Sequence, residues 1–524
     1  MPAGGAVITA SAQKRRQSSR ASRRCAADRA ARTEAVATPT GRVGPAARRA
    51  RLPGARRSAA AWRSARRSVV LAVAAVALLS CAAETGPPDI VLVSLDTLRR
   101  DHVGLDAGGG RSLTPALDAL AAESVVFDDA WAQVPFTLPS HMSIFTGLYP
   151  DVHGVDRKTA RLAAAVPTLP ELLRTAGYHT VGLVSNLWME GDFGFARGFD
   201  HYERLPYGLV YADRVNRRAF ELLDARGDDG RPLFLFLHYI DPHSDFFKAG
   251  ENALPYYAPA AFLEGLGVTP ASREFCDPAG GCATEFLIAA DRDSRPLPEA
   301  TVERIAALYG RGVAYLDGEI GELVAGLRQR SLWDDSLVLV TSDHGEEFRE
   351  HGRFVHVQPY VESLAVPLLI KLPRAQRAGT RVAATVETVD YLPTLLDAAG
   401  VPPPSPVQGR SLLPLVRGEP QPERSAFGRD KLDRQRFALR LGRSTLVHHL
   451  ETGRCELYDR IDDPGERLDI ANRRPQAVDA MRATLLAIID ANRALAAKIA
   501  APQVGADVLT EDEAAKLRAI GYLE

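Results

Sequence analysis

Short apolar runs alternate with amphipathic stretches from about residue 89 onward. Five runs are rich in Val, Ile, Leu or Phe without polar alternation, which is typical of strands buried on both faces by helices. This order predicts βαβ units and a mostly parallel sheet between helices. The predicted strands are Ile90–Leu95, Thr180–Ser185, Leu233–Ile240, Leu337–Thr341 and Val366–Leu372, and predicted helices include Pro115–Ala122, Leu169–Ala176, Val302–Gln329 and Val389–Ala398.

Acidic residues and histidines follow three of these predicted strands. Five of them stand at or just after a strand end, namely Asp96, Asp241, His243, Asp343 and His344. A single Asp at such a place most often caps a helix. Ligands of open α/β sheets, however, bind outside the carboxyl ends of the strands. Because three strands bring metal-ligand chemistry to one edge of the sheet, we expect a metal or anion site there.

The first 67 residues carry a large share of the positive charge. They contain 17 Lys and Arg but only Asp28 and Glu34, whereas the remaining chain holds 47 basic and 63 acidic residues. The formal net charge of -1 therefore hides two segments of opposite sign. Because residues 1–65 lack an apolar period, we expect a disordered basic leader there. Such a leader could bind nucleic acid, or it reflects a translation start assigned too far upstream. We expect no nucleic-acid partner for the mature protein.

An unbroken apolar run, Val69–Leu79, follows the leader and is succeeded by Ser80 and Cys81. The run is too short for a bilayer core, which needs about 20 residues, but its basic flank and small final residue match a secretory signal. Residues 66–81 are interpreted as a signal peptide with a lipobox, and residues 82–88 as a linker. The resemblance to a bacterial lipobox implies cleavage before Cys81 and a lipid on its sulfur. We expect an exported bacterial lipoprotein that is membrane-anchored, periplasmic or on the outer surface.

Two further cysteines, Cys276 and Cys282, flank a turn-prone stretch with Pro and Gly. An exported compartment permits a disulfide between them, although the spacing alone leaves the pairing open. Both lie in a long segment, from about Phe246 to Pro298, that carries no interpretable signature. We expect substrate specificity to come chiefly from this segment.

Five short motifs, taken in order, resemble those of the sulfatase family within the alkaline phosphatase superfamily. They span about residues 89–524 and comprise Leu92–Asp101, Phe136–Pro150, Asp343–Glu347, Glu456–Asp459 with Asp463–Glu466, and Leu517–Tyr522. The resemblance implies an α/β fold with a mostly parallel central sheet between helices and a smaller C-terminal α+β subdomain. We accordingly expect a catalytic domain over residues 89–400, the C-terminal subdomain over 401–475 and a helical tail over 476–524.

The resemblance also implies a metal-dependent ester hydrolase. Asp96, Asp343 and His344 match metal ligands, and Thr137 matches the nucleophile, which would also contact the metal. The nucleophile attacks sulfur or phosphorus, and the covalent intermediate is then hydrolysed. Two carboxylates and an imidazole suit zinc or manganese, whereas sulfatases proper usually bind calcium through oxygen ligands. We expect a divalent cation, with zinc favoured and calcium or manganese as alternatives.

The nucleophile segment departs from the sulfatase pattern. Sulfatases convert Cys or Ser, in a Cys/Ser-x-Pro-x-Arg pattern, to formylglycine. Here the pattern begins at Thr137 and ends at His141. Threonine cannot give formylglycine because its β-carbon carries a methyl group, so we expect none. Since Thr-x-Pro-x-His resembles nucleotide pyrophosphatase/phosphodiesterases, a phosphoester is favoured over a sulfate ester. The alternatives are a true sulfuric ester hydrolase, a phospho-group transferase and a non-catalytic anion-binding protein.

Five further residues have more than one interpretation. Asp241, His243 and His356, with His141, could hold a second metal. Alternatively, His243 and His356 bind the ester oxygens or protonate the leaving group, or His243 merely caps a turn. His351 either orients a metal ligand or faces the solvent. The substrate is expected to be a small-molecule, glycan or lipid ester.

Overall fold

The computed structural model of the chain divides into Met1–Ala83 and Glu84–Glu524. The structure describes residues 86–106, 112–206, 211–227, 229–244, 254–256, 259, 262, 274–276, 282–431, 434–505 and 507–519. The predicted leader, the predicted lipobox with Cys81 and most of the predicted linker lie outside these residues. Among the helices that are described, none is long and apolar enough to cross a membrane.

In the described part of the chain, eight strands form the main sheet. They are β1 (Ile90–Leu95), β2 (Val125–Trp131), β4 (His179–Val184), β5 (His201–Arg204), β6 (Leu233–Tyr239), β7 (Leu337–Thr341), β10 (Ala365–Lys371) and β11 (Arg381–Glu387). Their order is β11-β2-β10-β7-β1-β6-β4-β5. Strand β10 runs antiparallel to both of its neighbours, and the other pairs are parallel. The predicted mostly parallel sheet is therefore confirmed.

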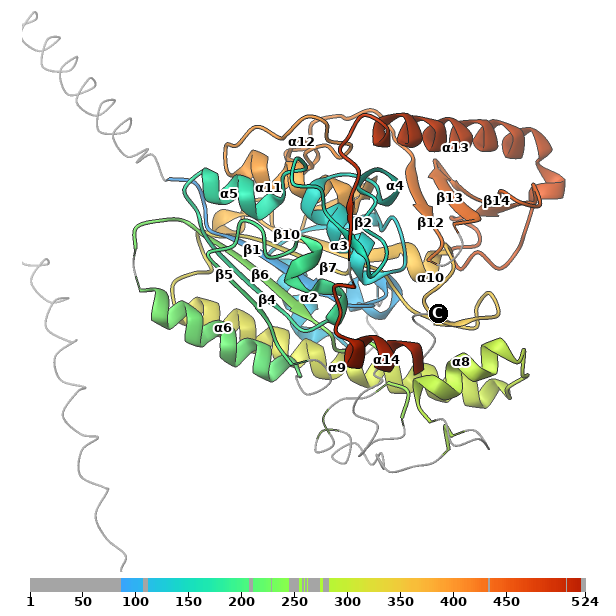
Figure 1. Cartoon of the computed structure of the whole chain (residues 1–524), viewed down its shortest axis with the longest axis horizontal. Helices are drawn as coiled ribbons and strands as arrows, with labels where there is room; N and C mark the ends of the chain where they lie inside the picture. The colour runs from blue at the N-terminus through green and yellow to red at the C-terminus, as the bar shows by residue number, and fades with distance from the viewer. Residues whose placement is uncertain are drawn as a thin grey trace, which may run out of the picture. The chain divides into compact units, whose positions relative to one another are not determined.

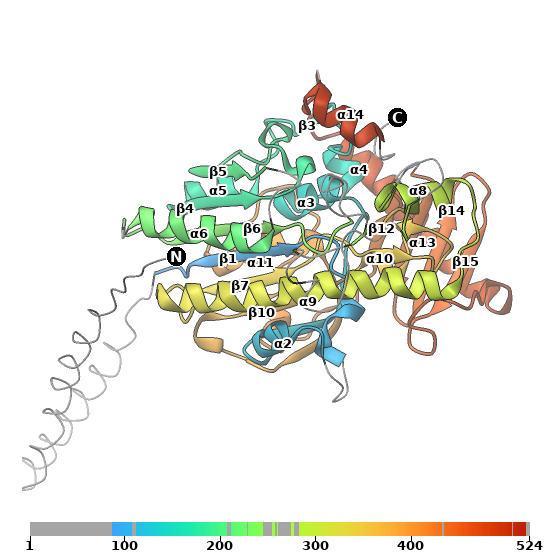
Figure 2. The ribbon, with the colours of Figure 1, turned by 90° about the horizontal axis from the view of Figure 1, so that it is seen from below.

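Helices cover both faces of this sheet (Figures 1 and 2). On β1, Ile90 and Leu92 pack with the side chains of one helical layer, whereas Val91 and Val93 pack with those of the other. A strand buried on both faces needs apolar residues at consecutive positions. One layer contains α3 (Thr137–Thr146), α5 (Leu169–Thr175) and α11 (Tyr391–Ala398), and the other contains α2 (Pro115–Ala122), α6 (Ala212–Arg226) and α9 (Glu299–Gln329).

A smaller sheet forms the C-terminal subdomain, at the right of Figure 1. Four of the described strands build it, all antiparallel, and a long helix packs against them. These elements are β12 (Ala426–Arg429), β13 (Arg436–Leu441), β14 (Ser444–His449), β15 (Cys455–Asp459) and α13 (Pro475–Ala496). Asp129 of β2 forms ion pairs with Arg440 (2.7 Å) and Arg460 (2.6 Å). Charged contacts therefore tie the subdomain to the main sheet.

The other α-helices and strands that the structure describes are short. They are β3 (Ala160–Arg161) paired with β16 (Gln503–Val504), β8 (Glu347–Phe348) paired with β9 (Phe354–Val355), and the helices α4 (Pro150–His153), α8 (Thr284–Arg292), α10 (Val361–Leu364), α12 (Leu413–Val416) and α14 (Glu511–Ala519). A disulfide joins Cys276 to Cys282 in the segment before α8.

Three strands of the main sheet, β2, β5 and β11, were not predicted from the sequence. In β2 the apolar run is interrupted by Asp128 and Asp129. Strands β5 and β11 lie at the two edges of the sheet, where one side has no neighbouring strand and charged residues are tolerated. Among the predicted elements, β4 and β6 end one residue earlier than expected, and α9 begins three residues earlier, at Glu299.

Candidate active site

Three buried side chains converge at the carboxyl ends of β1 and β7. One ligand atom each of Asp96, Asp343 and His344 lies within 4.8 Å of the others, and all three residues are fully buried. Asp96 Oδ1, Asp343 Oδ2 and His344 Nε2 make no hydrogen bond. Buried polar atoms almost always have a partner, so three ligand atoms without one fit a divalent cation. These are the residues that the sequence analysis expected to ligate the metal.

The two carboxylates have opposite pKa shifts. Burial raises the pKa of Asp343 well above its usual range, and the charge of Asp96 adds to this shift. Burial acts in the same sense on Asp96, but a hydrogen bond to His238 and the nearby His243 hold the pKa of Asp96 below its usual range. Two carboxylates this close repel each other when both are ionised, and a bound cation would offset that repulsion. Burial lowers the pKa of His344 to about 4, so its imidazole is neutral and able to ligate a metal.

The main chain orients Asp343 and His344. Asp343 Oδ1 accepts hydrogen bonds from the N–H groups of Thr97 (3.2 Å) and His344 (3.0 Å). His344 Nδ1 lies 3.0 Å from the carbonyl oxygen of Gly345. Because a carbonyl only accepts, Nδ1 carries the proton and Nε2 remains for a ligand. A side chain at Gly345 would overlap the carbonyl oxygen of Glu362, so this loop requires glycine there.

Two residues that the sequence analysis did not single out hold Asp96. His238 Nε2 lies 3.1 Å from Asp96 Oδ2, and Asn186 Nδ2 donates to the same oxygen at 2.7 Å. The Asn186 amide also lies 3.5 Å from the hydroxyl oxygen of Thr137. Asn186 follows β4 closely, so the rule applied to the other strand ends would have found it. His238 lies inside β6, and its only signal was a polar residue within an apolar run.

Thr137 is buried at the first position of α3. The N–H groups and the positive dipole end of a helix favour an anion at this position. The hydroxyl of Ser140 donates to the carbonyl oxygen of Asp343 at 2.7 Å. This bond fixes α3 to the loop that carries Asp343 and His344, which we call the metal loop. Through Asn186 on one side and Ser140 on the other, the structure places the predicted nucleophile beside the predicted metal ligands.

The sequence suggested that His141 could belong to a second metal site, but both of its ring nitrogens take part in hydrogen bonds. Its Nε2 lies 2.9 Å from Ser94 Oγ, and its Nδ1 lies 2.9 Å from the Thr137 carbonyl oxygen. Burial lowers the pKa of His141 to about 3, which keeps the ring neutral. Within the described residues, the group around Asp96 is the one cluster of three ligands close enough for a metal ion. The contacts of His141 thus support the nucleophile segment.

His243 and His356 lie beside His344. The ring centroids of His344 and His356 are 4.5 Å apart, and those of His243 and His356 are 5.1 Å apart. Asp241 belongs to the same loop as His243, and all of these residues are buried. Burial, followed by the charge of Lys431, keeps the pKa of His356 well below its usual range. His243, His344 and His356 therefore form one group of buried imidazoles beside Asp96.

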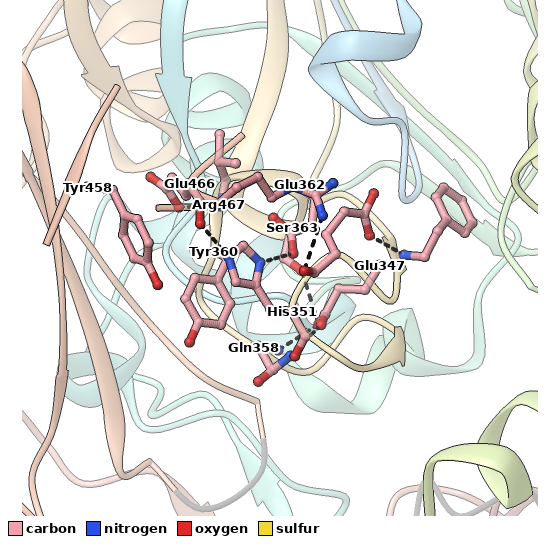
Figure 3. Close-up of polar contacts among 12 residues, drawn as sticks. Glu347, His351, Gln358, Tyr360, Glu362, Ser363, Tyr458, Glu466 and Arg467 are labelled. Carbon is pink, nitrogen blue, oxygen red and sulfur yellow. Dashed lines mark hydrogen bonds and ion pairs between the residues drawn. The ribbon is translucent and has the colours of Figure 1, made fainter. Parts of the chain in front are cut away.

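His351 forms a network of polar contacts with Glu347, Glu362 and Glu466 and their neighbours (Figure 3). His351 Nδ1 is 2.7 Å from Glu362 Oε1, and Nε2 is 2.7 Å from the carbonyl oxygen of Glu466. The imidazole stacks on Tyr360 with ring centroids 3.6 Å apart. Burial alone would lower the pKa of His351, but Glu362 raises it to about 8. His351 therefore neither faces the solvent nor touches a metal ligand, but forms a largely buried ion pair.

The main chain joins this network to the metal loop. The N–H of Gly345 donates to the carbonyl oxygen of Ser363 at 2.8 Å. Glu347 Oε1 accepts hydrogen bonds from the N–H groups of Val357 (2.7 Å) and Gln358 (2.8 Å). The network therefore fixes both the metal loop and the segment that follows β9.

The profile of the family described as Sulfatase matches residues 88–401, and that of the N-sulphoglucosamine sulphohydrolase C-terminal domain matches residues 349–491. The chain belongs to the sulfatase family. This family is metal-dependent, which agrees with the cluster of Asp96, Asp343 and His344. The identity of the metal is not fixed by this match.

Curated relatives of this sulfatase-family chain are ester hydrolases. The N-acetylglucosamine-6-O-sulfatase of Bacteroides thetaiotaomicron is 25% identical over 504 residues, covering 78% of this chain and 88% of that protein. The choline-sulfatase of Rhizobium meliloti is 26% identical and covers 78% of this chain and 86% of its own length. The chain is accordingly an ester hydrolase, and hydrolysis of sulfate esters has the support of these relatives.

Solved structures share the fold of this sulfatase-family enzyme. A protein in complex with its substrate D-glucosamine-2-N,6-O-disulfate aligns with a TM-score of 0.62 at 22% identity, covering 79% of this chain and 98% of that one. The phosphonate monoester hydrolase of Agrobacterium radiobacter aligns with a TM-score of 0.60 at 22% identity, covering 77% and 96%. At this level of identity the alignments establish the fold alone.

Proposed function

We propose that this sulfatase-family enzyme hydrolyses phosphate-type esters, with Thr137 as the nucleophile. The observation that carries the proposal is the position of Thr137, which the Asn186 amide joins to Asp96. A divalent cation bound by Asp96, Asp343 and His344 would lower the pKa of the hydroxyl and offset the charge of the ester. Zinc is favoured because carboxylates and a neutral imidazole match its ligand preferences.

The hydrolysis has two steps. In the first, Thr137 Oγ1 forms a bond to phosphorus, its proton passes to solvent, and the bond from phosphorus to the leaving oxygen breaks. In the second, a water oxygen attacks phosphorus, the bond to Oγ1 breaks, and the hydroxyl of Thr137 is restored. Because burial keeps the pKa of His356 low, His356 does not act as the general acid, and the leaving oxygen takes its proton from water.

The preference for phosphorus follows from the chemistry of threonine. Formylglycine forms from Cys or Ser, and the methyl group on the β-carbon of Thr137 prevents that conversion. Without an aldehyde, the covalent intermediate is released by a second attack at its central atom. Two successive displacements at phosphorus are well suited to a metal-dependent site.

Hydrolysis of sulfate esters is the second candidate. It is supported by the relatives named as N-acetylglucosamine-6-O-sulfatase and choline-sulfatase, each of which covers 78% of this chain. The substrate would then be the sulfate ester of a sugar or another small molecule. The same residues would act, with sulfur in place of phosphorus.

A panel of aryl esters separates the two candidates. We expect the zinc-loaded enzyme to show higher kcat/KM for p-nitrophenyl phosphate, its diester or p-nitrophenyl phenylphosphonate than for p-nitrophenyl sulfate. Thr137→Ala should lower kcat/KM by about 1,000-fold or more because the nucleophile is lost, whereas Thr137→Ser keeps a hydroxyl and should retain measurable turnover. A preference for the sulfate would favour the second candidate. Equal rates for wild type and Thr137→Ala would exclude Thr137 as the nucleophile.

We also propose that the chain is exported and anchored to a membrane through a lipid on Cys81. The support is the order of basic leader, apolar run and Cys81 in the sequence. Cys81→Ser should move the protein from the membrane fraction to the soluble exported fraction. If the variant stays in the membrane fraction as wild type does, the lipid is not the anchor.

A further inference from the structure

Lys431 belongs to the C-terminal subdomain, two residues after β12, yet it lies at the active site. Its N–H donates to the carbonyl oxygen of Val357 at 3.1 Å, next to His356. Its ammonium nitrogen lies over the ring of Phe136, 4.9 Å from the centroid. Phe136 directly precedes the nucleophile Thr137. Lys431 is thus held between the nucleophile segment and the histidine segment of the site.

The charge of Lys431 acts on the residues around the metal cluster. It lowers the pKa of His356 and of His344, and it counteracts the upward shift of Glu346. Burial lowers the pKa of Lys431 itself to about 7, against the opposing effects of Glu346 and Asp96. These mutual effects place the ammonium in the electrostatic environment of the site.

The chemistry of the reaction calls for a cation at this position. A phosphate or sulfate ester brings negative charge to a site that already contains Asp96 and Asp343. A hydrogen bond from an ammonium to a charged oxygen is about twice as strong as one between neutral groups. Lys431 is partly exposed, whereas Thr137 and His356 are buried.

We propose that Lys431 binds the anionic oxygens of the ester during turnover, so that the C-terminal subdomain completes the active site of the catalytic domain. The inference rests on the proposed function, because it assigns Lys431 to the ester that Thr137 attacks. The sequence analysis missed Lys431 because no motif surrounds it and it reaches the site through tertiary packing. A merely structural lysine, held by Phe136 and Glu346, would leave anion binding unchanged when replaced.

Equilibrium binding of inorganic phosphate and of inorganic sulfate to the metal-loaded full chain tests this inference without turnover. Whichever of the two anions the wild type binds, we expect Lys431→Met to increase its Kd by about 10- to 100-fold. This is the loss typical of one charged hydrogen bond. Lys431→Arg keeps the positive charge and should retain part of the affinity. Lys498→Met is the matched control, because Lys498 is exposed in the turn after α13. This variant should bind the anion with wild-type affinity.

Metal content and the midpoint of thermal unfolding are measured for each variant, and Lys431→Gln replaces Lys431→Met if the latter fails to fold. Wild-type affinity in folded, metal-loaded Lys431→Met or Lys431→Gln would overturn the inference, and so would a wild-type protein that binds neither anion. The failure of the proposed function is distinct. If anion binding depends on Lys431 but no ester of the panel is hydrolysed, the anion-binding role of Lys431 stands and the hydrolytic assignment falls.

Discussion

Single residues in this site make two contacts at once, and Asn186 is the clearest case. Its amide donates to Asp96 at 2.7 Å and lies 3.5 Å from Thr137. Asn186→Ala should therefore lower kcat about 10- to 100-fold, the cost of one hydrogen bond to a charged group, with little change in KM. Steady-state kinetics of the metal-loaded variant provide the measurement.

A second buried asparagine supplies the control for that substitution. Asn492 lies in α13, far along the chain from the metal ligands, and accepts a hydrogen bond from Gln408 at 2.8 Å. Asn492→Ala should lower the free energy of unfolding without changing kcat per folded, metal-loaded molecule. If both alanine variants reduced kcat alike, the loss at Asn186 would reflect stability and not its contacts with Asp96 and Thr137.

Residues of the candidate site could be predicted from the sequence to different extents. Asp96, Asp343 and His344 could be predicted, because parallel strands end at one edge of the sheet and each of these residues stands just after a strand. Asn186 follows the same rule and was overlooked. Lys431 could not be derived, because the strand that precedes it belongs to another sheet and only tertiary packing brings it to Phe136.

Among the structural elements, the metal loop is supported by the ion pair of His351 with Glu362. The pKa of His351 rises to about 8 in the folded state, above its ordinary value of about 6.5. The stability that this pair contributes is therefore fully present below pH 6.5 and lost as the pH rises through 8. The difference in free energy of unfolding between wild type and His351→Gln should be larger at pH 6 than at pH 9 by about 2 kcal/mol.

Urea unfolding of both proteins at the two pH values, each loaded with metal, measures this difference. His201 pairs with Glu203 at 3.0 Å on a more exposed strand, and His201→Gln is the control. His201→Gln should change the free energy of unfolding only slightly at either pH, because exposed ion pairs contribute little to stability. A pH-independent difference for His351→Gln would show that the pair does not titrate as a unit.

Central strands with nearly uniform burial were predicted to within one residue, whereas the edge strands β5 and β11 were missed. Strands β1 and β7 have every residue buried, and their predicted bounds are those observed. Strand β11 alternates exposed and buried residues at an edge of the sheet, which a search for continuous apolar runs does not detect. Strand β10 was found as a strand, but its reversed direction is a property of the chain path and not of its own residues.

For the molecule as a whole, the metal cluster is both the predicted catalytic centre and a source of stability. Without a cation, burial and the charge of Asp96 raise the pKa of Asp343. In the metal-free protein, the contribution of Asp343 to stability should therefore be greatest below pH 4 and decrease as the pH rises above it. A metal present at about 1,000 times its Kd adds about 4 kcal/mol to the free energy of unfolding.

Chelation followed by thermal unfolding tests this expectation. The midpoint should fall on removal of the metal and recover when zinc is restored, and the loss should be larger at pH 8 than at pH 5. Asp343→Asn should reduce the pH dependence of the free energy of unfolding of the metal-free protein, because the contribution of Asp343 is removed. The sample must be shown to contain metal before chelation. If chelation then leaves the midpoint of thermal unfolding unchanged, the cation does not stabilise the fold.

The hydrogen bond between Thr97 and Asp343 joins residues 246 positions apart. A growing chain has made the first ligand long before the second exists, so the cluster cannot assemble until most of the polypeptide has been synthesised. Metal acquisition is thus a late event in the life of the molecule. The ion that fills the cluster is chosen from the surroundings in which folding finishes, whatever ions were abundant where translation began.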